Sequence, residues 1–75
     1  MPIKYIVLEI QRFSAEQIAI VTPIFTSSNR NAAESEWHRL CSIAAVSSVP
    51  RHTVILIDDM GIMYTMKSYE HEQED

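Results

Sequence analysis

The chain has 75 residues, 47% of them apolar, and a formal net charge of -4. This length fits one small domain, and the apolar fraction excludes a disordered chain, which lacks the surface to offset the entropy of ordering. Four of the ten acidic residues lie in positions 70–75, so residues 1–69 hold six acidic residues against six basic ones. A neutral body disfavours both a basic nucleic-acid binder and an acidic mimic of DNA.

The single cysteine and the start of the sequence narrow the class of protein further. Cys41 has no second cysteine to pair with, which excludes a small scaffold held by internal disulfides. The first residues lead into a predicted strand without the pattern of a signal peptide, and no apolar run approaches ~18 residues. We therefore expect an intracellular protein that makes no contact with a membrane.

The first part of the chain predicts two strands. Residues 3–11 form an apolar run of strand type, with two sets of side chains on opposite faces. A loop at residues 13–16 leads to a second strand, which runs from about Gln17 to Thr22 and extends toward Phe25. Pro23 marks this strand as an edge or bulged strand, because proline has no N–H to donate to a ladder.

Residues 31–48 predict the only helix. Asn31 followed by Glu34 is close to a capping box, and Pro50 disfavours helical backbone at the residue before it. At about 100° per residue, apolar side chains gather on one side of this helix. They are Ala33, Trp37, Leu40, Ile43 and Ala44, with the tryptophan as the largest anchor.

Residues 52–57 and 62–69 predict two further strands, joined by the turn Asp58-Asp59-Met60-Gly61. The predicted fold is α+β with the order ββαββ, a four-stranded, mainly antiparallel sheet with one helix packed on one face. The expected strand order is 2-1-3-4. Residues 1–69 then form a single domain, and residues 70–75 form an acidic, frayed tail.

One helix can cover only one face of this sheet, yet the first and third strands are apolar on both faces. The expected core anchors are Trp37, Leu40, Ile6, Leu8 and Ile10. The apolar side chains on the opposite face of the sheet are then left uncovered, which predicts self-association, most simply as a homodimer. These side chains are Ile3, Tyr5, Val7, Ile55 and Ile57. The alternative is that a small domain simply exposes some aliphatic side chains.

No group of polar residues predicts a catalytic or metal site. His38 and Cys41 stand three residues apart on the helix, a spacing that suits a thiol–imidazole pair or two zinc ligands, but zinc requires three or four ligands. Asp58 and Asp59 beside Gly61 are more typical of a turn than of paired carboxylates. The sequence therefore predicts a non-enzymatic protein that uses no metal and no cofactor.

A polar segment before the helix is the candidate contact for an anion or a partner protein. Free N–H groups and the dipole at a helix N-terminus favour negative charge, and an arginine in this segment would add a cation. The alternative is that its serine and asparagine side chains only cap the helix. The segment consists of Ser27, Ser28, Asn29, Arg30 and Asn31.

Several short motifs are spread along most of the chain. They are Lys4-Tyr5, Glu9-Ile10-Gln11, Ala33-Glu34-Ser35, Trp37-His38, Ala44-Ala45-Val46-Ser47, Pro50 with His52-Thr53, and Tyr69-Glu70-His71. Through these motifs the chain resembles a set of small proteins carried by phages and prophages of gut bacteria. That set has a glycine-containing turn where this chain has residues 13–16, so the first hairpin is expected to be longer or irregular. The resemblance implies a phage-derived accessory protein in the cytoplasm of a bacterial host, and it carries over no catalytic residue.

These expectations together predict a small, non-enzymatic binding protein of phage origin. We expect it to antagonise a host process, above all an antiviral defence, by occupying a protein surface or sequestering a ligand. Its partner is then a host or phage protein, and direct binding of nucleic acid is not expected. The alternative is a structural or morphogenesis component of a phage particle, in which the same apolar surface packs into a larger assembly.

Overall fold

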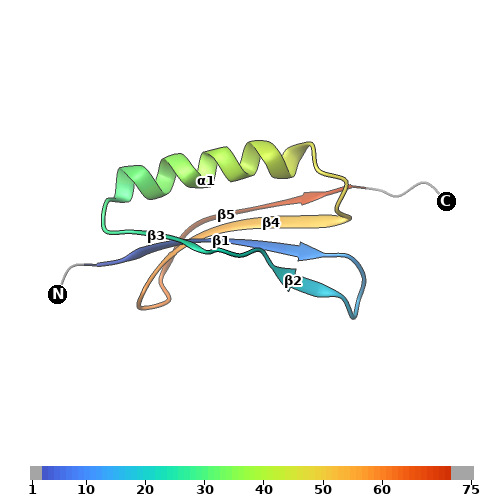
Figure 1. The fold of residues 1–75 in the computed structure, drawn as a ribbon, viewed down its shortest axis with the longest axis horizontal. Helices are drawn as coiled ribbons and strands as arrows, with labels where there is room; N and C mark the ends of the chain where they lie inside the picture. Colours follow the sequence, from blue (N-terminus) through green and yellow to red (C-terminus); the bar gives the residue numbers. More distant parts are fainter. Residues whose placement is uncertain (1–2, 72–75) are drawn as a thin grey trace.

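The computed structural model describes residues 3–71, in which one helix packs on one face of an antiparallel sheet (Figure 1). The elements follow one another as β1 (Tyr5–Arg12), β2 (Ile18–Ile20), β3 (Phe25–Ser27), α1 (Arg30–Ala45), β4 (Arg51–Asp58) and β5 (Met63–Glu70). The predicted α+β fold is confirmed, with five strands in place of four. Residues 72–75, most of the predicted acidic tail, lie outside the described residues. Glu70, where that tail was expected to begin, is the last residue of β5.

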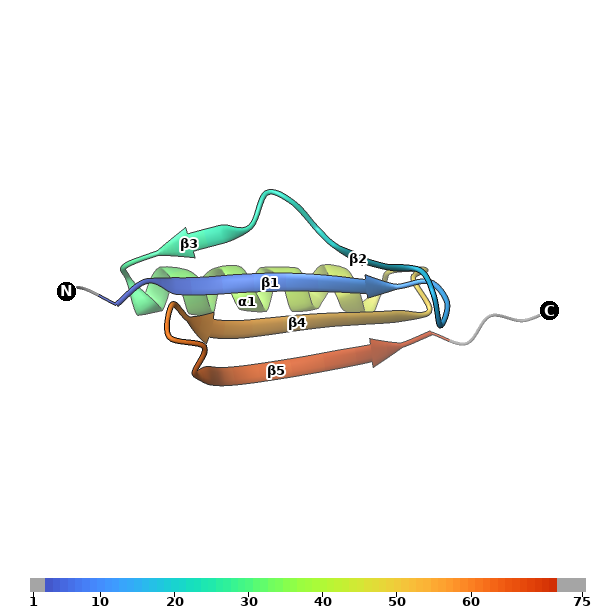
Figure 2. The same cartoon turned by 90° about the horizontal axis from the view of Figure 1, so that it is seen from below.

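The second predicted strand is divided into two short strands, and both pair with β1 (Figure 2). β2 pairs with residues 10–12 and β3 with residues 5–7. Between them, the N–H of Val21 still donates to the carbonyl oxygen of Glu9 at 2.8 Å, and residues 22–24 leave the sheet. Pro23 lies in this departing segment and follows a cis peptide bond. Its missing N–H explains why the ladder is interrupted there. The order β2-β1-β4-β5 is the order that the sequence predicts.

β4 lies at the centre of the sheet and pairs with β1 along all eight residues. On its other side it pairs with β5, with an irregularity between Leu56 and Ile57. The turn from β4 to β5 contains Gly61 at a φ of 86°, a conformation that other residues rarely adopt. The predicted place of this turn is confirmed.

The helix begins and ends earlier than the sequence indicates. Asn29, not Asn31, is the N-cap, because its side-chain oxygen accepts hydrogen bonds from the N–H groups of Asn31 (2.9 Å) and Ala32 (3.2 Å). The helix ends at Ala45, and the next residue is the C-cap. The expectation that it continues to Ser48 is therefore wrong by about one turn.

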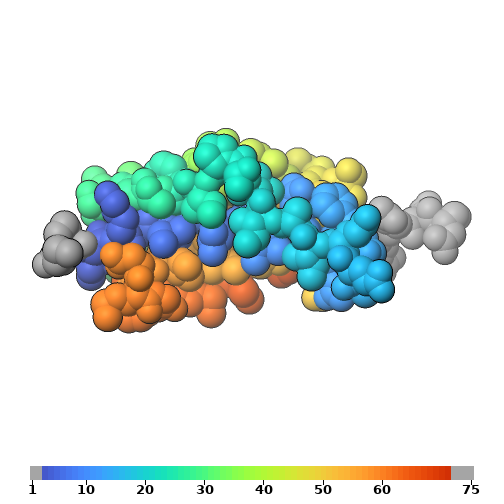
Figure 3. All heavy atoms as spheres, turned by 60° about the horizontal axis from the view of Figure 1, so that its bottom comes forward, coloured from blue at the N-terminus to red at the C-terminus, as the bar shows by residue number. Residues whose placement is uncertain are grey.

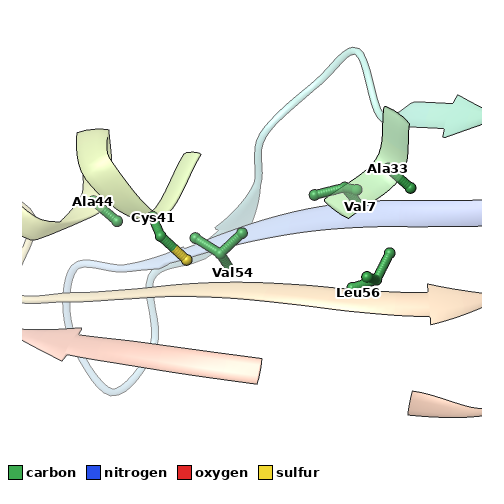
Figure 4. Packing of buried hydrophobic residues seen from close by; sticks show 6 residues of the cluster. All are labelled: Val7, Ala33, Cys41, Ala44, Val54 and Leu56. Atoms are coloured by element: carbon green, nitrogen blue, oxygen red, sulfur yellow. The ribbon is translucent and has the colours of Figure 1, made fainter. Parts of the chain in front are cut away.

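The core lies between α1 and one face of β1 and β4. It consists of Val7, Ala33, Cys41, Ala44, Val54 and Leu56, most of which Figure 4 shows pointing into the space between helix and sheet. Trp37 and Leu40 pack against this cluster. Nε1 of Trp37 donates a hydrogen bond to the carbonyl oxygen of Val54 at 3.1 Å, which ties the helix to the central strand.

The two faces of β1 are exchanged relative to the prediction. Val7 is only 2% exposed and belongs to the core, whereas Ile6, Leu8 and Ile10 are half-buried and lie outside the core cluster. The expectation that these three residues anchor the core is wrong. Alternation fixes which residues share a face, but it does not say which face the helix covers when both are apolar.

Shortening Trp37 tests its contribution to this packing. We expect Trp37→Ala to lower the free energy of unfolding by about 3 kcal/mol or more, as for other buried aromatic side chains. Trp37→Phe keeps a six-membered ring and loses the pyrrole ring together with the hydrogen bond to Val54, so its cost should be smaller, about 1–2 kcal/mol. Urea unfolding followed by circular dichroism measures both values. Equal costs for the two variants would show that ring packing contributes little.

Candidate functional site

The sheet face turned away from the helix has no described element over it (Figure 2). The strand register places nine apolar side chains on it, since directly paired residues of neighbouring strands point to the same face. We call this surface the open face. It consists of Ile6, Leu8 and Ile10 of β1, Ile18 and Ile20 of β2, Ile55 and Ile57 of β4, and Met63 and Met66 of β5.

The side chains of the open face form rows across the sheet. Leu8, Ile55 and Met66 make one row, and the neighbouring row consists of Ile6, Ile57 and Met63. Cross-strand neighbours of this kind have Cβ atoms about 5 Å apart, so the rows form one continuous surface. Figure 3 brings this side forward and shows the atoms of β1 with those of β2 beside them, while the helix atoms remain along the upper margin.

Charged side chains of this face are confined to one end. Arg12 and Arg51 are paired there across β1 and β4, and Arg51 forms an ion pair with Glu70 of β5. The hydrogen bond from Arg51 lowers the pKa of Glu70. The two central rows carry no charge, so nothing in them opposes the removal of water.

The outer strands leave large apolar side chains in contact with solvent. The exposed fraction is 60% for Ile18, 53% for Ile20, 56% for Met63 and 53% for Met66. Single exposed aliphatic residues are ordinary in soluble proteins, but a contiguous set of this size is typical of an interaction surface.

The residues predicted to mediate self-association are divided between the two faces. Ile55 and Ile57 lie on the open face, as their phase in β4 predicts. Tyr5 and Val7 pack on the helix side, so their assignment to an uncovered face is wrong. Ile3 precedes β1 and is 45% exposed.

The polar segment before the helix is used within the fold. Ser27 Oγ accepts a hydrogen bond from the N–H of Asn29 at 3.0 Å, and Asn29 caps the helix. Arg30 forms an ion pair with Glu34 at 3.2 Å and lies over the ring of Tyr64, 4.8 Å from its centroid. Ser28 and Asn31 are exposed. These contacts favour the capping alternative over a site that gathers its polar groups around an anion.

Three hydrogen-bonded polar residues, Glu9 of β1, His52 of β4 and Ser47 after α1, join the two central strands to the end of the helix. Glu9 and His52 are buried, and Ser47 is half-buried. His52 is 1% exposed, and its Nε2 lies 2.5 Å from Oε1 of Glu9, which is 8% exposed. Its Nδ1 lies 3.1 Å from Oγ of Ser47, and that oxygen also accepts the N–H of Val49. One imidazole ring thus bridges the Glu9 carboxylate and the Ser47 hydroxyl, and both of its nitrogens have a partner within the fold.

The sequence analysis did not identify this hydrogen-bonded group of Glu9, His52 and Ser47, although the strand pattern contains a signal for the Glu9–His52 pair. Glu9 shares its face of β1 with Tyr5 and Val7, and His52 shares its face of β4 with Val54. Two polar residues at core phase on neighbouring strands predict a buried pair, since a buried charge requires a partner. Serine, histidine and carboxylate also make up nucleophilic triads, but here the serine oxygen is held in the turn after α1 by Val49.

His38 and Cys41 are not brought together as a reactive pair. The His38 ring is exposed and stacks edge-on against Trp37, with the centroids 5.0 Å apart, while Cys41 is buried in the core. Burial raises the pKa of the Cys41 thiol, which disfavours the nucleophilic thiolate. Among residues 3–71, no three His, Cys, Asp or Glu side chains are grouped as a metal site would require.

Asp58 holds the turn between β4 and β5 and does not pair with Asp59 for chemistry. Its Oδ1 accepts the N–H groups of Met60 (2.9 Å) and Ile62 (3.0 Å), and its Oδ2 accepts the hydroxyl of Tyr64 (2.9 Å). Burial alone would raise the pKa of Asp58, but these hydrogen bonds together lower it.

The lowered pKa of Asp58 predicts how stability depends on pH. A carboxylate whose pKa is lower in the folded state than its ordinary value of 3.8 stabilises the fold above that value, and the stabilisation is lost as pH falls through the folded-state pKa. We expect Asp58→Asn to be less stable than the wild type at pH 7 and the difference to shrink below about pH 4. Thermal unfolding across this range measures it, with Asp59→Asn as the exposed control. A difference independent of pH would contradict the assignment.

The described part of the chain contains no helix long and apolar enough to cross a membrane. Comparisons with models of protein families, with curated proteins and with solved structures gave no match. The function must therefore be argued from the geometry of the chain itself.

Proposed function

We propose that this protein is a non-enzymatic binding protein whose open face is its main interaction surface. The observation that carries this proposal is the set of nine apolar side chains on an uncovered sheet face. Water contact with such a surface is unfavourable by about 25 cal/mol per Å² of apolar area, so covering it drives association.

The size of the open face suits a specific interface. Strands of eight residues are about 26 Å long, and three to four strands at about 4.8 Å spacing give a width of about 14–19 Å. The projected area is therefore about 400–500 Å², and the accessible area of projecting side chains is larger. A specific interface requires about 500 Å² or more from each partner.

The occupant that fits this surface most simply is a second copy of the chain. The central rows are uncharged, so two copies related by a two-fold axis place no like charges against each other. Two sheets packed face to face form a sandwich whose inner layer consists of the side chains of both inner faces. Isoleucine, leucine and methionine are the residue types that such a layer requires.

The hydrogen bonding of the polar residues supports a role without catalysis. His52 uses both ring nitrogens within the fold, and Asp58 uses both carboxylate oxygens to hold a turn. A catalytic site requires a nucleophile, a base and room for a substrate beside them.

Resemblance supplies the biological setting of the proposal. The motifs shared with small phage and prophage proteins favour an antagonist that acts in the host cytoplasm by occupying a protein surface. The dimer, in which the two open faces are packed against each other, is then the unit that binds the target through its remaining surface. A virion or morphogenesis component remains the alternative, and it differs in the partners it would bind.

Two exposed methionines provide a matched test of self-association. Met66 lies on the open face and is 53% exposed, whereas Met60 lies in the β4–β5 turn and is 79% exposed. We expect the wild type and Met60→Lys to sediment at micromolar concentration near twice the monomer mass of 8.6 kDa. Met66→Lys should sediment as a folded monomer, because two buried ammonium groups would oppose packing. A monomeric wild type would contradict the proposal.

The same variants test the biological role. We expect affinity-tagged wild type and Met60→Lys to capture a host defence protein from phage-infected cells. Met66→Lys should lose it if the dimer is the binding unit. Mass spectrometry of the captured proteins gives the result. Capture of capsid or tail proteins instead would favour the morphogenesis alternative and contradict the antagonist.

A further inference from the structure

The second feature of the molecule that fits a ligand is a cleft at the β1 edge of the sheet. Residues 21–24 join β2 to β3, and we call them the strap. The N–H of Val21 donates to the carbonyl oxygen of Glu9 at 2.8 Å, and residues 22–24 then leave β1. Figure 2 shows the strap arching away from β1. A cleft of about 520 Å³ lies between the strap, β1 and the side of α1. Small-molecule sites have volumes of about 300–1,000 Å³.

The lining of the cleft is divided about equally between apolar and polar atoms. Val7, Phe25 and Leu40 contribute apolar walls from β1, β3 and α1. Glu9 of β1 and the pair Glu36 and Arg39 of α1 contribute the charged groups. Apolar walls beside charged groups suit a ligand that has both an apolar part and a charged part.

Glu9 presents a nearly buried carboxylate to this cleft. Its Oε1 is bonded to His52, and no other donor in residues 3–71 bonds the carboxylate. Every fully buried side-chain nitrogen or oxygen in that part of the chain has a hydrogen-bond partner, so Oε2 of Glu9 must contact solvent. The cleft is the solvent-filled space that Glu9 lines.

The charge of the cleft favours a cation. Arg39 donates two hydrogen bonds to Glu36, at 2.6 and 2.7 Å, and this pairing lowers the pKa of Glu36. The arginine is thus balanced by its own helix neighbour. Glu9 also interacts electrostatically with Arg39. The residues that line the cleft thus include two carboxylates, Glu9 and Glu36, and one guanidinium, Arg39.

We propose that the strap cleft binds a primary ammonium group carried on an apolar stem. The ammonium group lies at Oε2 of Glu9, and the stem lies between Phe25 and Leu40. Two sources have this chemistry, a free small amine and the lysine side chain of a partner protein. The site is independent of the open face, because Glu9 and the open-face residues lie on opposite faces of β1.

Phenethylamine and 2-phenylethanol are matched probes, because they share the phenylethyl stem and differ only in carrying an ammonium group or a hydroxyl group. We expect phenethylamine to shift the backbone amide NMR signals of Glu9, the strap and Leu40, and to bind about tenfold more tightly than the alcohol. N-acetyl-lysine methylamide separates the two sources. Binding as tight as that of phenethylamine indicates a partner lysine, and weaker binding indicates a free amine. Equal binding of phenethylamine and the alcohol, or no shifts at the strap, would overturn the proposal.

Glu9→Gln is the variant that isolates the carboxylate, since it keeps the size of the side chain and an oxygen for His52. We expect it to bind the amine no more tightly than the alcohol. Glu16→Gln removes an exposed carboxylate in the β1–β2 loop and should keep the tenfold preference. Retention of the preference in a folded Glu9→Gln variant would overturn the proposal. If Glu9→Gln does not fold, the comparison of the two probes on the wild type decides.

Discussion

One helix lies over a sheet that has apolar side chains on both faces, and the rest of the molecule follows from this constraint. The 16 residues of α1 extend about 24 Å, which matches the length of β1 and β4. The helix can therefore cover one face from end to end and cannot reach the other. In the described residues nothing else covers that other face. A surface of isoleucine, leucine and methionine is therefore left outside the core.

The hydrogen bond between Glu9 and His52 allows β1 to bury a face that contains a charged residue in place of its wholly apolar face. In β1 the set Ile6, Leu8 and Ile10 is wholly apolar, whereas the set that faces the helix includes Glu9. A chain that only minimised exposed apolar area would bury the first set. Burying Glu9 instead requires a partner for its charge, and His52 of the central strand supplies it at 2.5 Å. The more apolar face of β1 is thereby left outside the core, which supports the proposal that the open face binds another chain.

The sequence predicted the positions of the helix and the strands better than it predicted which face of β1 packs against the helix. Alternation, turn residues and Pro50 located β1, β2, α1, β4 and β5 to within a few residues, but they did not predict β3 as a separate strand. The strand order follows from two hairpins joined through a helix. The facing of β1 was not predictable from hydrophobicity, because it is decided by a long-range pair between Glu9 and His52. The cleft was not predictable either, since it depends on how far the strap leaves the sheet around Pro23. Of the proposed open face, the sequence identified Ile55 and Ile57 as uncovered and placed the β1 residues on the wrong side.

The division of the second strand links the two proposed surfaces. Because β2 pairs with the end of β1, it adds Ile18 and Ile20 to the open face and widens it by one strand. Because the strap leaves the sheet only after Val21, whose N–H donates to the carbonyl oxygen of Glu9, a cleft lies at this edge of β1 and is lined by Glu9. A continuous second strand would close the cleft and cover that edge. In the two proposals, the apolar face binds a protein partner and the edge binds a small cationic group, so that the single strand β1 serves both.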